Sequence, residues 1–187
     1  MALLSLLNWT WAAFFRRPKD LKRRYGSWAI VTGATDGIGK AASLELASRG
    51  LNLILLGRNP SKLQRVIKEI HHKYFLIDIK TLVIDLSKEC GSEIVRKVRE
   101  EIEGLDVGVL INNAGVSYKY ASFVHEVDSG VVENIVRVNV EGVMWMTKAV
   151  VPLMMEKRRG AVVNVGSASA SLLSSFPLYT VYAATKS

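Results

Sequence analysis

The sequence contains a single cysteine, Cys90, so no disulfide bond can form within the chain. Its cysteine content therefore gives no indication of an oxidising compartment. Internal repeats and low-complexity tracts are also absent. What is present is a chain of 187 residues, 49% hydrophobic and 22% charged. That composition and length are typical of one globular α/β domain with a core of its own rather than of a disordered chain.

Acidic residues are outnumbered by basic ones, and the excess of positive charge is concentrated in one short segment. The net charge is +8, and residues 16–24, with the sequence RRPKDLKRR, hold six basic residues and one acid. The remainder of the chain is nearly balanced. Because neither a known binding motif nor an aromatic–basic groove accompanies this run, we do not expect a nucleic-acid partner.

The segment before the basic run is almost entirely apolar. Residues 1–15 read MALLSLLNWTWAAFF, and as a helix they would extend about 22 Å, against roughly 30 Å for a hydrocarbon core. Trp9 and Trp11 suit a membrane interface. In a cleaved signal peptide the positive charge comes first, whereas here it follows. We interpret residues 1–24 as an N-terminal membrane anchor with a basic flank, either marginally spanning or interfacial, with the rest of the chain cytosolic. The alternative is an amphipathic helix packed on the domain or on a partner.

Five short apolar runs alternate with longer helical patterns after residue 25. Each is a continuous series of Val, Ile and Leu, which indicates strands buried on both faces of a parallel sheet. Repeated strand–helix alternation predicts a doubly wound α/β (Rossmann-type) domain over residues 25–187. Because such a sheet commonly has six strands, we expect this one to be incomplete. The predicted strands lie within residues 28–33, 51–57, 80–86, 107–115 and 160–167.

The first predicted strand runs into the glycine-rich sequence VTGATDGIGKA. Gly33, Gly37 and Gly39 stand between this strand and the following helix. Glycines permit a tight turn and a close approach to a pyrophosphate, and the helix N-terminus offers N–H groups and a positive dipole end to the anion. The spacing differs from Gly-x-Gly-x-x-Gly, but its position at the first strand–helix turn favours a dinucleotide site.

The end of the second predicted strand indicates which dinucleotide binds. Arg58 stands there, 21 residues after Gly37. An acidic residue at this point would bind the ribose hydroxyl of NAD, whereas an arginine suits the 2′-phosphate of NADP. We therefore expect NADP, the alternative being a solvated surface arginine.

Six motifs in order along the chain resemble those of the short-chain dehydrogenase/reductase family. They are TGATDGIG at 32–39, DL at 85–86, NNAG at 112–115, VNVEG at 138–142, NVGS at 164–167 and YAATK at 182–186. They cover the chain from about Ser27 to its end. Within the family, the apolar start and the sequences around the first, second and fourth strands resemble the membrane-bound very-long-chain 3-oxoacyl-CoA reductases. The related 17-beta-hydroxysteroid dehydrogenases are similar too.

The resemblance implies a role for each matching residue. Asp85 and Asn113 would line the adenosine side of the cofactor, and Asn139 would hold a water in a proton relay. Tyr182 would be the general acid for ketone reduction and Lys186 its activator. The implied catalytic set is Asn139, Ser167, Tyr182 and Lys186. The implied cofactor-binding set is Gly33, Thr35, Gly37, Ile38, Gly39, Arg58, Asp85, Asn113, Tyr182 and Lys186.

The chemistry of ketone reduction supports a tyrosine and a lysine four residues apart. Hydride addition leaves negative charge on the carbonyl oxygen, which needs a proton donor and hydrogen-bond donors. A free tyrosine has a pKa of about 10, and a nearby ammonium group favours the phenolate. On a helix, residues four apart share one face. The serine is less well determined, because the strand motif selects Ser167 and the commoner family spacing selects Ser169.

The remaining candidates have structural interpretations. His71 and His72 have no further ligands at suitable spacing, so no metal site is expected. Tyr118 and Tyr120 are expected in a surface loop. Five residues of the long helix after the fourth strand are expected to form one buried face: Met144, Trp145, Met146, Met154 and Met155.

These features together predict an NADPH-dependent reductase of 3-oxoacyl-CoA in very-long-chain fatty acid elongation, at the cytosolic face of the endoplasmic reticulum membrane. Its partners would be acyl-CoA and the membrane, with other elongation enzymes or a second copy as further candidates. The alternatives are a hydroxysteroid dehydrogenase and a non-catalytic nucleotide-binding form. Because family members continue beyond the Tyr-x-x-x-Lys helix, we expect a truncated chain that binds NADPH without substantial turnover.

Overall fold

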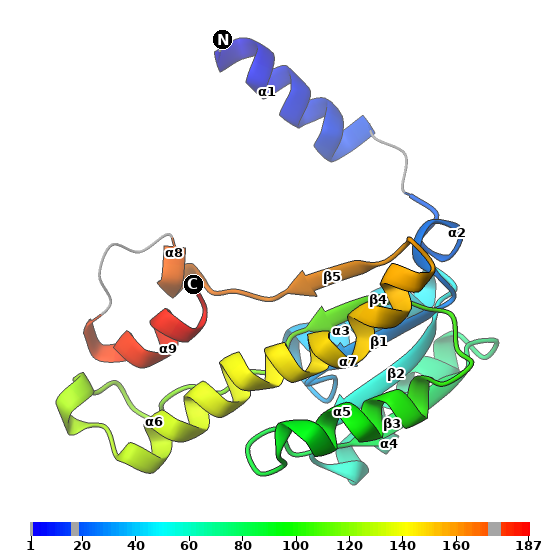
Figure 1. Cartoon of the computed structure of the whole chain (residues 1–187). Helices are drawn as coiled ribbons and strands as arrows, with labels where there is room; N and C mark the ends of the chain where they lie inside the picture. The colour runs from blue at the N-terminus through cyan, green and yellow to red at the C-terminus, as the bar shows by residue number, and fades with distance from the viewer. Residues whose placement is uncertain (1, 16–18, 172–176) are drawn as a thin grey trace.

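The computed structural model describes residues 2–15, 19–171 and 177–187, and Figure 1 shows the arrangement of their elements. Five strands carry the fold: β1 (Trp28–Thr32), β2 (Asn52–Gly57), β3 (Ile79–Val83), β4 (Val107–Asn112) and β5 (Ala161–Asn164). The α-helices are α1 (Ala2–Thr10), α2 (Leu21–Tyr25), α3 (Gly37–Ser48), α4 (Pro60–Lys73), α5 (Gly91–Ile102), α6 (Ser129–Val136), α7 (Gly142–Glu156), α8 (Ala168–Ser171) and α9 (Thr180–Thr185). Short 3-10 turns lie at Val124–Glu126 and Pro177–Tyr179, and π-helical turns at Trp11–Phe15 and Arg137–Glu141.

The strands form one parallel sheet in the order β3-β2-β1-β4-β5. In the centre, Ile30 of β1 is aligned with Ile54 of β2 on one side and with Leu110 of β4 on the other. The chain therefore leaves β1 toward β2 in one direction and returns to β4 in the other. This confirms the predicted doubly wound sheet of five strands and places its topological switch point between β1 and β4.

Helices cover both faces of the sheet. In Figure 1, α5 and α7 lie in front of the strands, and α3 and α4 lie behind them. The side chains of β1 alternate between the two resulting cores. Ile30 packs with residues of α5 and α7, while Ala29 and Val31 pack with residues of α3 and α4. Because both faces are covered, both sets of side chains are apolar, which explains the continuous apolar runs in the sequence.

The expectation of burial on both faces is wrong for the two edge strands. β1, β2 and β4 are almost completely buried, but Val83 at the end of β3 is 48% exposed. Val162 and Val163 of β5 are 38% and 47% exposed. An edge strand has one strand neighbour and less helix cover, so the same apolar composition produces a half-open strand there.

Two other predictions about burial are corrected by the structure. On α7, Met146 and Met154 are buried as expected, but Met144 and Met155 are 53% and 71% exposed. The buried pair are eight residues apart and share a face of the helix, whereas the exposed pair lie off that face. Tyr118, expected at the surface, is only 9% exposed.

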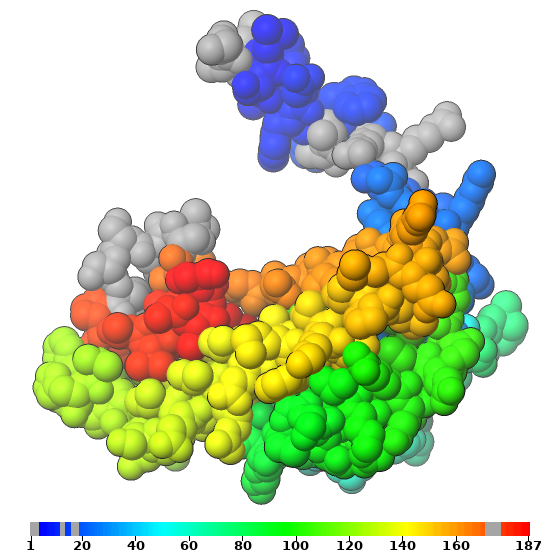
Figure 2. Space-filling view, in the orientation of Figure 1, coloured from blue at the N-terminus to red at the C-terminus, as the bar shows by residue number. Residues whose placement is uncertain are grey.

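The apolar segment at the start of the chain forms α1 and the following π-helical turn. Its large side chains are exposed, with fractions of 57–72% for Leu4, Leu6, Leu7, Trp9, Trp11, Phe14 and Phe15. Figure 2 shows this segment standing clear of the folded body. Among residues 2–15, 19–171 and 177–187, none of the helices has both the length and the apolar character needed to cross a bilayer.

Candidate active site

The turn after β1 is shaped by glycines with different tasks. Gly37 begins α3 at φ +49°, and a side-chain carbon added there would contact nothing within 4 Å. At Gly39 such a carbon would lie 2.3 Å from the carbonyl oxygen of Gly33, so any larger residue would push the helix away from the turn. The glycines thus leave an open surface at the helix N-terminus and hold the helix close to the strand.

A polar clasp joins this turn to the end of β4. The Asn113 side-chain amide donates to the carbonyl oxygens of Thr32 and Gly33 at 3.0 and 3.2 Å. In return, the buried Thr32 hydroxyl accepts the N–H groups of Asn113 and Ala114 at 3.0 and 2.9 Å. Asn113 therefore supports the glycine turn directly, besides lining the cavity described next. Thr32 was missed by sequence reasoning, although it stands in the quoted motif VTG.

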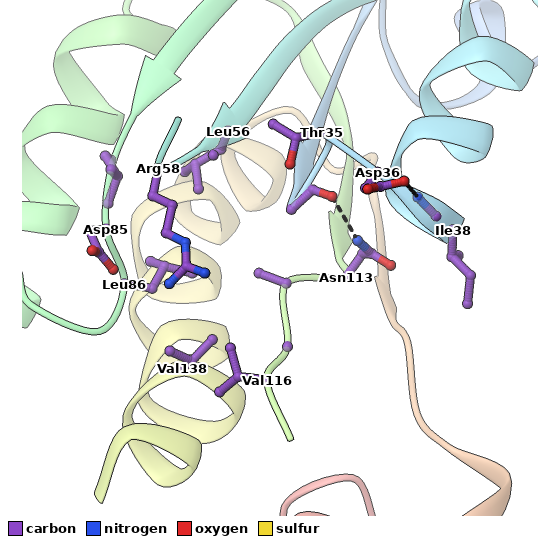
Figure 3. Close-up of a pocket in the computed structure, with 16 residues that line it drawn as sticks. Thr35, Asp36, Ile38, Leu56, Arg58, Asp85, Leu86, Asn113, Val116 and Val138 are labelled. Carbon is purple, nitrogen blue, oxygen red and sulfur yellow. Dashed lines mark hydrogen bonds between the residues drawn. The ribbon is translucent and has the colours of Figure 1, made fainter. Parts of the chain in front are cut away.

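A cavity of about 480 Å³ opens at this switch point. Figure 3 shows its wall, with the guanidinium group of Arg58 extending into the space from the end of β2. Seven of the predicted cofactor-binding residues line it: Gly33, Thr35, Gly37, Ile38, Arg58, Asp85 and Asn113. Asp36, Leu56, Gly57, Ile84, Leu86, Ala114, Gly115, Val116 and Val138 complete the lining.

Asp85 is held as a carboxylate at the edge of this cavity. The hydroxyl of Ser87 donates to it at 2.6 Å, and the N–H of the same residue donates at 3.1 Å. The hydroxyl contact lowers the pKa of Asp85 below its usual value against the effect of burial, and the charges of Lys88 and Arg58 act in the same direction. The wall therefore carries a fixed negative charge close to a positive one.

Asn139 lies in the π-helical turn between α6 and α7 and is 3% exposed. Its side-chain oxygen accepts the N–H of Val116 at 2.8 Å, and its amide donates to the Val116 carbonyl at 3.0 Å. The same amide nitrogen lies 3.0 Å from the hydroxyl of Thr185 in α9. Asn139 thus links the loop after β4 to the helix that carries Tyr182.

Lys186 reaches the same loop from the other side. Its ammonium group donates to the carbonyl of Val165, after β5, at 3.1 Å. A side-chain carbon placed at Gly115, which lines the cavity, would lie 2.9 Å from the Lys186 nitrogen. Burial lowers the pKa of the Lys186 ammonium from its usual value. Lys186 follows the last residue of α9, so it stands at the helix end and not within a regular turn.

The two serine candidates are neighbours in space. Their hydroxyl oxygens lie 2.8 Å apart, and the Ser169 N–H is 3.3 Å from the Ser167 oxygen. Ser167 is in the loop after β5, whereas Ser169 is in the short helix α8. Position relative to the strand therefore favours Ser167, with Ser169 placed to orient its hydroxyl.

Tyr182 lies on α9 and is half-buried. The helix is braced from below by Tyr118, whose ring stacks on that of Tyr179 with centroids 5.5 Å apart. The Tyr118 hydroxyl also accepts the N–H of Val181 at 3.0 Å. Sequence reasoning missed this contact, because a tyrosine after NNAG carries no signal of the helix that packs against it 63 residues later.

The fold and cavity define a doubly wound α/β protein with a glycine-rich turn at the switch point of its sheet, the place where such proteins bind dinucleotides. A family model described as short chain dehydrogenase matches residues 27–187. The chain therefore belongs to the short-chain dehydrogenase family.

Two curated relatives and one solved structure illustrate the similarity. The very-long-chain 3-oxoacyl-CoA reductase-like protein of Arabidopsis thaliana is 48% identical over 183 residues, which is 98% of this chain and 57% of the relative. The inactive hydroxysteroid dehydrogenase-like protein 1 of Homo sapiens is 44% identical over 150 residues, which is 80% of this chain and 44% of the relative. A metagenomic short-chain oxidoreductase in complex with NADP superposes with a TM-score of 0.79 at 27% identity, covering 90% of this chain and 72% of that one. The chain thus spans about half the length of the curated relatives it matches.

Proposed function

We propose that this protein takes part in the NADPH-dependent reduction of 3-oxoacyl-CoA to 3-hydroxyacyl-CoA. The observation that carries the proposal is the meeting of two groups of residues at one end of the sheet. The glycine turn, Arg58 and Asp85 form one side of the cavity, and Gly115 connects it to Asn139 and Lys186. The cavity thus adjoins Asn139 and Lys186, two of the residues to which we assign the proton-transfer chemistry.

The cavity wall fits the cofactor. By helix geometry, the N–H group of Ile38, which lines the cavity, has no carbonyl partner within α3, so it is available to a pyrophosphate. Arg58 projects into the cavity where the 2′-phosphate of NADP would lie, and Asp85 and Asn113 stand on the adenosine side. The relative of known structure was solved with NADP.

The cofactor, when bound, supplies the hydride, and the chain's own residues manage the proton and the carbonyl. Tyr182 donates a proton to the carbonyl oxygen as negative charge develops there. Lys186, four residues after Tyr182, provides a positive charge that favours the phenolate, and Ser167 donates a hydrogen bond to the carbonyl oxygen. Asn139 holds the loop at Val116 and the end of α9 in register.

The substrate class rests on the name of the Arabidopsis relative and on the apolar start of the chain. An acyl-CoA with a very long chain partitions to membranes, and residues 4–15 expose leucine, tryptophan and phenylalanine side chains. We place the protein at the endoplasmic reticulum membrane, with the sheet domain in the cytosol, in fatty acid elongation. The basic residues 16–24 follow the apolar segment, as the positive-inside rule requires for this orientation.

The second candidate function is turnover of a hydroxysteroid-type substrate by the same residues. Nucleotide binding without turnover is a third. The human relative named inactive hydroxysteroid dehydrogenase-like protein 1 motivates both. Tyr182 and Lys186 are both present in this chain, which favours catalysis over an inactive role.

The test compares two proteins. The first is the 187-residue chain, titrated with NADPH. The second is a chimaera that continues this chain with the remainder of the Arabidopsis relative, assayed for NADPH consumption with 3-oxoacyl-CoA and with a ketosteroid. We expect NADPH binding by both proteins and consumption of NADPH by the chimaera with the acyl-CoA. Turnover of the ketosteroid alone would support the hydroxysteroid substrate, and absence of NADPH binding would refute the proposal.

A further inference from the structure

A cluster of basic side chains lies where the strands of the sheet begin. Four basic residues, here called the basic patch, line a shallow hollow with a volume of about 550 Å³: Lys19, Lys22, Arg23 and Arg49. Asp20 and Leu21 complete its lining. All four basic side chains are exposed. The patch combines three members of the basic run at residues 16–24 with Arg49, the residue that follows α3. The sequence displays the basic run, and the fold brings Arg49 beside it.

Most of the positive charge of the basic patch is not neutralised by the protein. Within the described part of the chain, the side chains of Lys19, Lys22 and Arg23 form no ion pair. The carboxylate of Asp20 accepts the N–H of Arg23 at 3.0 Å and so serves as the helix cap. Arg49 is paired with Glu45 at 2.7 Å. Three exposed cations therefore remain available to an external anion.

The basic patch is fixed rigidly to the sheet domain. Leu21 and Tyr25, on α2, pack against the core beneath α3 and α4. A side-chain carbon at Gly26 would lie 2.7 Å from the Asp106 carbonyl oxygen, so α2 is followed by a close backbone contact with the start of β4. The Asp106 carboxylate then accepts the N–H of Ser27 at 3.1 Å. Whatever binds the patch therefore orients the whole domain.

The basic patch and the cofactor cavity lie at opposite ends of the strands. The patch adjoins the residues that precede β1, β2 and β4, whereas the cavity follows their last residues. Figure 1 shows α2 at the end of the sheet where the strands begin and α9 at the end where they finish. A five-residue strand separates these two ends by about 16 Å.

We propose that the basic patch binds the headgroups of anionic phospholipids. The end of the sheet where the strands begin then faces the bilayer, and the cofactor cavity faces away from it. This inference rests on the proposed membrane association. A lipid is favoured over a soluble anion because exposed apolar side chains, up to Phe15, stand four residues before Lys19. Basic residues at a membrane surface add attraction to anionic lipids for each charge present.

The first test measures binding of the 187-residue chain to vesicles by flotation. Vesicles of phosphatidylcholine are compared with vesicles of phosphatidylcholine and phosphatidylserine. The patch variant is Lys22→Glu with Arg23→Glu. The matched control is Lys68→Glu with Arg99→Glu, which makes the same change in net charge at exposed positions of α4 and α5. We expect the anionic lipid to strengthen binding of the wild type and the control by about tenfold or more, and the patch variant to lose this gain.

The outcomes separate the inference from the proposal beneath it. Failure to bind either kind of vesicle would refute membrane association itself. Equal binding to both kinds, or an undiminished gain in the patch variant, would refute the basic patch alone. Loss of the gain in millimolar inorganic phosphate, but not in chloride of equal ionic strength, would show that the patch takes a soluble phosphate instead.

The second test measures orientation and uses the single cysteine. Cys90 is exposed and follows β3, on the cavity side of the sheet. One protein carries a fluorophore at Cys90, and the other carries it at residue 48 through Ser48→Cys in a Cys90→Ser background. On vesicles with nitroxide-labelled headgroups, we expect quenching several times stronger at residue 48, beside Arg49. Equal quenching, or stronger quenching at Cys90, would overturn the proposed orientation.

Discussion

The side-chain amide nitrogen of Asn139 lies 3.0 Å from the hydroxyl oxygen of Thr185. This contact joins a buried residue between α6 and α7 to the residue before Lys186. The Thr185 hydroxyl in turn donates to the carbonyl of Tyr182 at 2.9 Å. Two residues of the candidate site, Asn139 and Tyr182, are therefore connected through a threonine to which sequence reasoning assigned no role, although it stands inside the YAATK motif.

Replacing Thr185 should loosen the helix that carries Tyr182. Thr185→Val keeps the branched shape but removes the hydroxyl, leaving the Asn139 amide with one partner fewer. We expect a loss of about 1 kcal/mol in the free energy of unfolding and several-fold weaker NADPH binding. Thr185→Ser retains the hydroxyl and should restore NADPH binding. Denaturant unfolding and fluorescence titration measure both effects, and equal behaviour of the two variants would contradict the role of this hydroxyl.

Arg58 should determine the preference for NADPH over NADH. A charge-assisted contact to phosphate contributes on the order of 1.5–3 kcal/mol, so Arg58→Asp should weaken NADPH binding by roughly tenfold to hundredfold. NADH binding should be retained or strengthened, because an acidic residue at this position can accept a hydrogen bond from the ribose hydroxyl. Both cofactors are titrated against wild type, Arg58→Asp and the control Arg99→Asp on α5. Equal or tighter binding of NADH by the wild type would reject the prediction.

Proton transfer and carbonyl binding should separate in the chimaera. Tyr182→Phe removes the proton donor and should lower kcat by about a hundredfold or more, while NADPH binding changes little. Ser167→Ala should reduce kcat more than Ser169→Ala, because Ser167 is in the loop after β5, whereas Ser169 is in α8 and contacts Ser167 at 2.8 Å. Steady-state kinetics of the three variants test this order. A larger effect of Ser169→Ala would reassign the carbonyl contact to Ser169.

Asp106 should make the stability of the domain depend on pH. Burial favours its neutral form, but hydrogen bonds from Lys157 and Ser27 and the charge of Arg159 outweigh this and lower the pKa of Asp106 below its usual value of 3.8. The contribution is therefore complete above that value and is lost as the pH falls through the lowered pKa.

The corresponding variant is Asp106→Asn. Because the carboxylate is about one-third exposed, we expect a loss of only about 1 kcal/mol at pH 7. The difference between wild type and variant should shrink in strongly acidic solution. Urea unfolding at several pH values measures it, and a difference that persists at the lowest pH would assign the effect to packing instead of charge.

The order and type of the central elements could be predicted from the sequence because each depends on local residues. The continuous apolar runs around Ile30, Ile54 and Leu110 indicated strands covered on both faces, and the three strands are buried. The glycine turn could be predicted as well, since the close backbone contact between Gly39 and Gly33 leaves no room for a side chain at Gly39. Arg58 was placed at the cavity by counting along a repeating strand–helix unit.

Tertiary structure alone decided the features that depend on partners distant in the chain. The exposure of Val162 and Val163 follows from the number of neighbours that β5 has, which its apolar sequence does not reveal. Tyr118 is buried because Tyr179, just before α9, stacks against it. Asn113 can donate to the Thr32 carbonyl because β1 and β4 are neighbours in the sheet. Arg49 likewise joins the basic residues 19–23 in the basic patch because α2 lies beside the end of α3. Local sequence determines which elements form, since helix and strand periodicity is a property of consecutive residues. Which side chains share an environment is determined by packing, which joins residues from separate parts of the chain.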